Sequence, residues 1–209
     1  VSRGLGDVYK RQILGIKLAQ KENISLKINS VIMQGINEKE IIPLIEFANC
    51  NKIDLRFIEL MPMNVAKNFK AVKEGDLKAI ISKKYGALKQ IDVFEGPAHY
   101  YQVENLSIKI GFISALSHKF CANCNRLRLT STGILKPCLH YNSGVNLNDL
   151  LKKNVTDEEI LAIIKDTIYH KPKNHHLENE AFSQKEDKSM SLILSLIHIS
   201  EPTRHSLIS

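Results

Sequence analysis

The chain has 209 residues and a formal net charge of +7, with 44% hydrophobic and 24% charged side chains. This composition is typical of a globular protein with one large or two small domains. No apolar run reaches the ~20 residues of a membrane helix and no signal-peptide pattern is found, so we expect a cytoplasmic protein without a membrane partner. The positive charge favours an anionic ligand, such as a nucleotide, a nucleic acid or phosphate.

Both ends of the chain differ from the rest. Residues 1–12 have no clear periodicity, residues 195–209 are similar, and both runs resemble translated sequencing-adapter sequence. The alternative is that they are disordered native tails. We expect the natural segment to run from about Ile13 to Leu194, with residues 179–194 as a polar, loosely ordered tail.

A strand, a helix and a second strand follow in residues 13–66. Residues 26–33 are rich in β-branched side chains, residues 37–52 have apolar side chains at helical spacing, and residues 53–62 predict the second strand. The helical stripe consists of Ile41, Leu44, Ile45 and Ala48. A strand–helix–strand unit predicts a parallel sheet, with functional groups at the carboxyl ends of its strands.

Strand alternation assigns side chains to faces. Lys27 and Asn29 share one face of the first strand. The residues expected on one face of the second strand are Leu55, Phe57, Glu59 and Met61. Cys50 falls on the apolar side of the helix, where we expect it to be an inert core residue.

The pattern changes after residue 66. Residues 74–86 predict a helix capped by Gly86, and residues 99–116 predict an antiparallel hairpin that turns near 104–105. We therefore expect a second, α+β part over residues 67–178.

A further helix is predicted to begin after Thr156. Thr156 and Glu159 have the spacing of a capping box. His170, His175 and His176 follow this helix, and we interpret them as a surface turn rather than a metal-binding tract.

Three of the four cysteines lie close together. Cys121, Cys124 and Cys138 form C-x2-C-x13-C, which in a reducing compartment indicates a metal site rather than disulfides. A hairpin over residues 126–138 brings Cys138 back beside Cys124. The pairs expected in it are Thr130 with Ile134, Arg128 with Lys136 and Arg126 with Cys138.

Two kinds of metal site fit three cysteines. A structural zinc ion needs four ligands, and His140 or His118 could complete a Cys3His set. An iron–sulfur cluster held by three cysteines leaves one iron without a protein ligand, where a substrate atom can bind. The zinc alternative corresponds to a non-enzymatic module that binds nucleic acid, although no recognisable nucleic-acid-binding fold or aromatic platform is present.

Two arginines accompany the cysteines. Arg126 and Arg128 point to one face of the predicted strand, and Leu127 points to the other. Two guanidinium groups side by side are suited to phosphate oxygens. The alternative is an ordinary solvated strand face.

Several stretches carry a resemblance to a known family. GPAHYYQV, IGFISALSHKFCANCNRLRLTSTGILKPCL and KPKNHH resemble the C-terminal half of the GTP 3′,8-cyclases of molybdenum cofactor biosynthesis, the MoaA family. KINSVIMQGINEKEI and LRFIELMP resemble the last barrel strands of that family, in the same order. The resemblance extends essentially from Ile13 to Ile193. Its centre, F-C-x2-C-N-R-x-R-L-T-x2-G-x-L-x2-C-L, is long and specific.

The resemblance implies an α/β fold class, with the C-terminal part of an incomplete (β/α) radical S-adenosylmethionine barrel followed by a small α+β iron–sulfur domain. In the family, a first 4Fe-4S cluster cleaves S-adenosylmethionine, and the resulting radical converts GTP to (8S)-3′,8-cyclo-7,8-dihydroguanosine 5′-triphosphate. The product passes to cyclic pyranopterin monophosphate synthase. The resemblance also implies GTP as substrate, a possible homodimer, and no nucleic-acid partner.

The resemblance assigns roles to particular residues. It implies that a second 4Fe-4S cluster, which binds the guanine, is held by Cys121, Cys124 and Cys138. The residues implied to bind GTP are Arg126, the backbone of Leu127, Arg128 and Lys27. Met61 is implied to contact S-adenosylmethionine. Without the resemblance, Lys27 would be interpreted as a solvated strand residue and Met61 as core packing.

The chain departs from the family pattern in two places. It has no C-x3-C-x2-C motif for the first cluster, and Leu194 and Ser195 stand where the family ends in Gly-Gly. We therefore expect a fragment of a cyclase that is inactive by itself.

Overall fold

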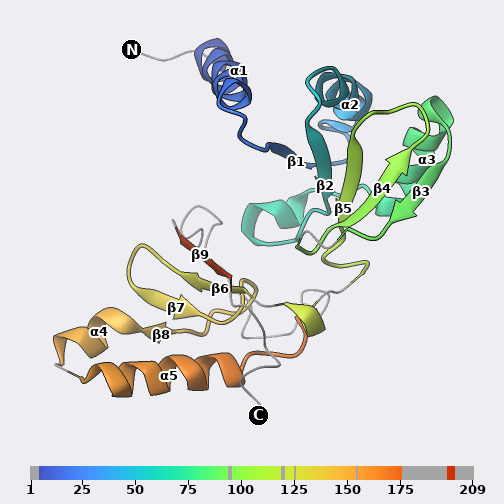
Figure 1. Cartoon of the computed structure of the whole chain (residues 1–209). Helices are drawn as coiled ribbons and strands as arrows, with labels where there is room; N and C mark the ends of the chain where they lie inside the picture. Colours follow the sequence, from blue (N-terminus) through green and yellow to red (C-terminus); the bar gives the residue numbers. More distant parts are fainter. Residues whose placement is uncertain are drawn as a thin grey trace. The chain divides into compact units, whose positions relative to one another are not determined.

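The computed structural model of the chain, drawn in Figure 1, describes residues 5–93, 96–118, 121–124, 126–153, 155–175 and 197–200. The chain forms two compact units. The first consists of residues 1–59 and 72–113, and the second of residues 60–71 and 114–209. Residues 72–113 join the first unit, so its sheet draws on both predicted segments, 13–66 and 67–178. The predicted domain limits and the adapter origin of the two ends stay predictions.

The first unit contains a mixed five-stranded sheet of order β1-β2-β5-β4-β3. Its strands are β1 (Lys27–Val31), β2 (Asp54–Ile58), β3 (Leu88–Ile91), β4 (His99–Val103) and β5 (Lys109–Ile113). β1, β2 and β5 run parallel, whereas β4 is antiparallel to β5 and to β3. The predicted parallel strand–helix–strand unit and the predicted hairpin are both confirmed, and the fold is a mixed α/β fold.

Three α-helices belong to the first unit (Figure 1). They are α1 (Leu5–Lys21), α2 (Ile41–Cys50), which follows the short 3-10 helix η1 (Glu38–Glu40), and α3 (Glu74–Tyr85). The predicted stripe of α2 is confirmed, because Ile41, Ile45 and Ala48 are fully buried and Leu44 packs against the same core. Gly86 ends α3 at φ 92°, a conformation that glycine adopts without strain.

The core of the first unit lies between α2, α3 and one face of the sheet. The buried residues from the two central strands are Leu55, Phe57, Ile110 and Phe112. The rings of Phe57 and Phe112 stack with centroids 6.0 Å apart. Burying side chains of this size contributes about 1.5–3 kcal/mol each. Strand alternation places Lys27 and Asn29 on the opposite face.

Cys50 is exposed, and the prediction that it is a core residue is wrong. A helix turns by about 100° per residue. Cys50 lies nine residues after the buried Ile41, which places it half a turn away from the buried stripe. The cysteine follows apolar neighbours in the sequence, but the helix directs it to solvent.

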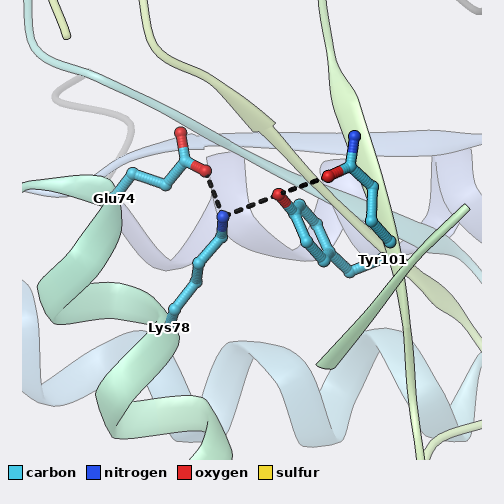
Figure 2. Close-up of polar contacts among 4 residues, drawn as sticks. Glu74, Lys78 and Tyr101 are labelled. Carbon is cyan, nitrogen blue, oxygen red and sulfur yellow. Dashed lines mark hydrogen bonds and ion pairs between the residues drawn. The ribbon is translucent and has the colours of Figure 1, made fainter. Parts of the chain in front are cut away.

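A polar network joins α3 to the sheet, as Figure 2 shows. Glu74 is only 8% exposed, and its carboxylate pairs with Lys78 at 2.5 Å. Lys78 donates to the hydroxyl of Tyr101 at 2.7 Å and lies 4.1 Å from the centre of its ring. Burial lowers the pKa of Lys78, but the hydrogen bonds to Glu74 and Tyr101 outweigh this effect and raise it. The ammonium therefore compensates a nearly buried carboxylate at the start of α3.

The second unit contains a four-stranded antiparallel sheet of order β8-β7-β6-β9. Its strands are β6 (Arg126–Leu129), β7 (Ile134–Lys136), β8 (Val145–Asn146) and β9 (Ile197–Ser200). Arg128 pairs with Lys136, and Thr130 N–H donates to Ile134 O at 3.0 Å, as predicted. β7 ends at Lys136, so the expected pair of Arg126 with Cys138 is not part of the ladder among the described residues.

The described residues of the second unit also form two α-helices, α4 (Leu147–Lys152) and α5 (Asp157–Tyr169), and two 3-10 helices, η2 (Asn64–Asn68) and η3 (Cys121–Asn123). α5 begins with the predicted capping box. Thr156 Oγ1 accepts from Glu159 N–H at 3.3 Å, and Glu159 Oε2 accepts from Thr156 N–H at 3.0 Å. The first turn of α5 is acidic, with Asp157, Glu158 and Glu159. Within the described part of the chain, every helix is too short or too polar to cross a membrane.

We expect Thr156→Ala to lower the free energy of unfolding by about 1 kcal/mol, because an N–H of the first turn of α5 loses its acceptor. Thr156→Ser is the matched control, since it keeps the hydroxyl, and it should unfold like the wild type. Urea unfolding followed by far-UV circular dichroism measures the difference. Equal midpoints for Thr156→Ala and Thr156→Ser would show that the cap contributes nothing.

Candidate functional site

The three clustered cysteines lie in the second unit, at the base of the β6–β7 hairpin. Cys121 opens η3, and Cys124 N–H donates to Cys121 O at 3.2 Å. Cys138 lies two residues after the end of β7. All three are free, partly buried thiols. The local fold therefore supplies two thiols from one turn and a third from the segment that follows β7.

The electrostatics of the cysteines are coupled. Burial raises the pKa of the Cys138 thiol, and the neighbouring Cys124 and Cys121 raise it further. A backbone hydrogen bond at His140 and the charge of Lys171 act in the opposite direction. Burial and the two neighbouring thiols thus oppose ionisation of Cys138, and a metal that binds its sulfur would favour the thiolate.

The sequence left open whether the cysteines bind one metal ion or a cluster. Among the described residues, no three or more His, Cys, Asp or Glu side chains form a group that could hold a metal ion. Zinc needs its sulfurs about 2.3 Å from one centre, and the Cys3His set with His140 or His118 stays an alternative prediction. An iron–sulfur cluster distributes its cysteines over separate irons, so its ligands need not surround one metal centre. The soft donors fit such a cluster chemically, and their role as its ligands stays a prediction.

A lysine that the sequence analysis did not single out lies beside the cysteines. Lys171 is 8% exposed, and its Nζ donates to the carbonyl oxygens of Cys124 at 2.8 Å and Arg126 at 2.6 Å. The same Nζ lies 3.4 Å from Cys124 Sγ. The sequence KPKNHH contains this lysine just before a proline, but two of its acceptors are backbone carbonyls, which no sequence pattern marks.

The two arginines occupy one face of β6, and Leu127, which is 4% exposed, faces the other side. Burial and the neighbouring Arg126 guanidinium lower the pKa of Arg128, while the Cys138 and Cys124 sulfurs partly oppose this. Lys136, which is 4% exposed, pairs with Arg128 across the ladder. Like charges at opposed positions destabilise a sheet, so an anion bound to this face would relieve their repulsion.

Two histidines pack next to the hairpin: His175 is buried and His140 is half-buried. The rings of His140 and His175 have centroids 5.1 Å apart. His175 is 3% exposed and its Nε2 lies 2.6 Å from Ala115 O, so the predicted surface turn is wrong for this residue. His170 is exposed and pairs with Asp166, and His176 lies outside the described residues.

Burial lowers the pKa of His140 to about 4, and His175 and Arg128 contribute in the same direction. The Nδ1 atoms of His140 and His175 are buried and have no hydrogen-bond partner among the described residues. Burial therefore favours the neutral imidazole of His140 beside the positively charged face of β6.

The remaining predicted site residues lie in different units. Met61 belongs to the second unit, where it packs in a small apolar cluster with Met63, Leu116 and Leu139. Leu139 directly follows Cys138 in the sequence. Lys27 belongs to the first unit, where it begins β1 opposite Asp54 of β2. The structure thus gathers the cysteines and arginines in one unit and places Met61 in the same unit.

Comparison with known proteins gives matches over most of the chain. Residues 53–177 match the family model described as Molybdenum Cofactor Synthesis C. A GTP 3′,8-cyclase of Clostridium perfringens (strain SM101 / Type A) is 43% identical over 166 residues, which cover 78% of this chain and 51% of the relative. A GTP 3′,8-cyclase of Clostridium botulinum (strain Hall / ATCC 3502 / NCTC 13319 / Type A) is 40% identical over 200 residues, which cover 94% and 59%.

Molybdenum cofactor biosynthesis protein 1 of Dictyostelium discoideum is 36% identical over 182 residues, which cover 84% of this chain and 29% of that protein. The chain spans about half the length of the curated bacterial relatives it matches. The matched region includes the three clustered cysteines, Arg126, Arg128 and Lys171.

We expect His140 to titrate with a pKa of about 4 in the metal-free chain. Because this value lies below the ordinary value of 6.5, the unfolded chain binds the proton first, and stability is lost as the pH falls from 6.5 towards 4. NMR titration of ¹³C-labelled histidines measures the pKa, with His140→Gln to assign the signal and His170→Gln to remove an exposed histidine. A His140 signal that titrates near 6.5 would contradict the burial argument.

Proposed function

We propose that this chain, which belongs to the Molybdenum Cofactor Synthesis C family, is the GTP-binding part of a GTP 3′,8-cyclase in molybdenum cofactor biosynthesis. The names of the relatives support the reaction. The observation that carries the proposal is the composition of a single hairpin. Three cysteine thiols lie at its base, and two arginines lie on one face of its strand β6.

Cys121, Cys124 and Cys138 would hold a 4Fe-4S cluster. When bound by three cysteines, such a cluster offers one iron to a nitrogen or oxygen atom of the guanine. The protein's part is to keep the three sulfurs in place and to limit access of water. Leu127 and Leu135, both buried, hold the hairpin that carries them.

Arg126 and Arg128 would bind the triphosphate. Guanidinium groups bind phosphate oxygens in pairs, and partial burial strengthens such charge-assisted hydrogen bonds. The backbone of Leu127 lies between the two arginines and can add a contact to the same ligand. An arriving phosphate would also offset the repulsion that lowers the pKa of Arg128.

Two further residues have proposed roles. Lys27, at the start of β1, would contact GTP, because an ammonium group is a compact donor for phosphate or purine oxygens. Met61 would contact S-adenosylmethionine, and its position in an apolar cluster suits a thioether that packs against an organic cofactor.

The whole enzyme is proposed to be cytoplasmic and to contain more than these residues. An incomplete radical S-adenosylmethionine barrel, to which the first unit would contribute strands, would carry another 4Fe-4S cluster and cleave S-adenosylmethionine. The whole enzyme would form a homodimer and pass the cyclised nucleotide to cyclic pyranopterin monophosphate synthase. Neither nucleic acid nor a membrane has a role in this proposal.

The zinc-binding alternative is not supported by a specific observation. It needs four ligands around one ion, and the described His, Cys, Asp and Glu side chains do not bring even three together in that way. A basic surface can also bind a nucleoside triphosphate, so the net charge does not favour a nucleic-acid ligand over GTP.

We expect the chain to take up about four iron and four sulfide ions per molecule on anaerobic reconstitution and to become brown, because three thiols suit one 4Fe-4S cluster. Iron and sulfide analysis with electron paramagnetic resonance spectroscopy measures this. Cys138→Ser should lose most of the iron, whereas Cys50→Ser, which alters the exposed cysteine of α2, should not. A colourless chain with one tightly bound zinc would overturn the cluster assignment.

We expect Arg128→Ala to weaken GTP binding by about tenfold or more, because one charge-assisted contact contributes about 1.5–3 kcal/mol. Isothermal titration calorimetry with the reconstituted chain measures the dissociation constant. Lys152→Ala, which removes an exposed cation from α4, is the control and should bind GTP like the wild type. Equal GTP affinities in Arg128→Ala and the control would remove the arginine from the site.

A further inference from the structure

The ammonium group of Lys171 lies at the junction between the cysteines and the arginines. Its Nζ donates to the carbonyl oxygen of Cys124 at 2.8 Å and to that of Arg126 at 2.6 Å. These two residues are the second cysteine of the C-x2-C pair and the first arginine of β6. One side chain therefore fixes the backbone both at the proposed cluster ligand Cys124 and at Arg126, the first residue of the proposed phosphate-binding strand.

The burial of this charge requires a reason. Lys171 is 8% exposed, and an ammonium taken out of water is costly unless polar or negatively charged atoms surround it. The Cys124 sulfur lies 3.4 Å from Nζ. In a metal cluster this sulfur is a thiolate, and the lysine then has an anionic neighbour at hydrogen-bonding distance.

The segment that carries the lysine is held at both ends. Lys171 N–H donates to Ile168 O at 3.1 Å, which continues the last turn of α5. Three residues on, Asn174 O accepts from the Tyr141 hydroxyl at 2.9 Å, and His175 Nε2 lies 2.6 Å from Ala115 O. The fold thus sets the position of the ammonium group, unlike that of a lysine side chain that moves freely at the surface.

We propose that Lys171 is a positioning residue that fixes Cys124 relative to Arg126 and places its ammonium group beside the cluster that Cys124 would hold. This inference rests on the proposed function. Partners of metal ligands that hydrogen-bond to the ligand residues orient them and tune the metal, and their loss lowers metal affinity by about 10–100-fold. A nearby cation also favours the reduced, more negative form of a cluster.

Three variants of the full chain test the role of Lys171. Lys171→Gln keeps a hydrogen-bond donor and removes the charge, and Lys171→Arg keeps the charge. Lys173→Gln makes the same chemical change at an exposed position two residues away and is the matched control. Each chain is reconstituted anaerobically, and its iron affinity, the reduction potential of the cluster and its far-UV circular dichroism are measured.

We expect Lys171→Gln to bind the cluster about tenfold more weakly. The cluster that does form should be reduced at a more negative potential, because the positive charge is absent. Lys171→Arg should restore most of the affinity and the potential, and Lys173→Gln should match the wild type. A residue with only a structural role would lower the thermal midpoint of unfolding without moving the potential.

The outcomes separate the two proposals. If wild type and Lys173→Gln take up no cluster, the proposed function fails, and this inference fails with it. If both load normally and Lys171→Gln has the same affinity and potential, only the role of Lys171 is overturned. If Lys171→Gln does not fold, Lys171→Arg decides: a folded, loaded Lys171→Arg supports the need for a cation, and an unfolded or unloaded one overturns the inference.

Discussion

A buried ammonium group links the parts of the second unit. Lys171 binds the carbonyl oxygens of Cys124 and Arg126, so the end of α5 and the start of β6 meet at one point. Because a buried charge is unfavourable without polar partners, moving either element would expose an uncompensated cation or two unpaired carbonyls. The hairpin, its cysteines and its arginines therefore depend on the packing of a helix that is distant in the sequence.

Local patterns predicted the elements of the fold better than their assembly. The stripe of α2 and the capping box of α5 follow from spacing within one turn of helix, and both are present. Outside the predicted hairpin with β4, the neighbour of β5 could not be predicted in this way. Its pairing with β2 depends on the burial of Phe112 against Phe57, which are 55 residues apart, and this long-range packing extends the parallel part of the sheet. Cys50 was misjudged because apolar neighbours in sequence do not share its helix face.

The site shows the same division. Alternation along a strand predicted that Arg126 and Arg128 share a face, and turn residues predicted the hairpin that pairs Arg128 with Lys136. Lys171 was not predictable, because its acceptors are carbonyl oxygens 47 and 45 residues earlier, and every residue type carries such an oxygen. The burial of His175 was missed for a related reason, since its contact is also with a backbone carbonyl, that of Ala115.

The direction of α5 has an electrostatic consequence for an anionic ligand. The helix begins with three carboxylates, Asp157, Glu158 and Glu159, and Lys171 follows its other end. At 1.5 Å per residue the carboxylates lie roughly 20 Å along the axis from Lys171, about two Debye lengths at physiological salt. Asp166, nearer that end, is paired with His170. The acidic residues thus interact favourably with the positive end of the helix macrodipole. They lie far enough from Lys171 that their repulsion of a phosphate bound near it is screened.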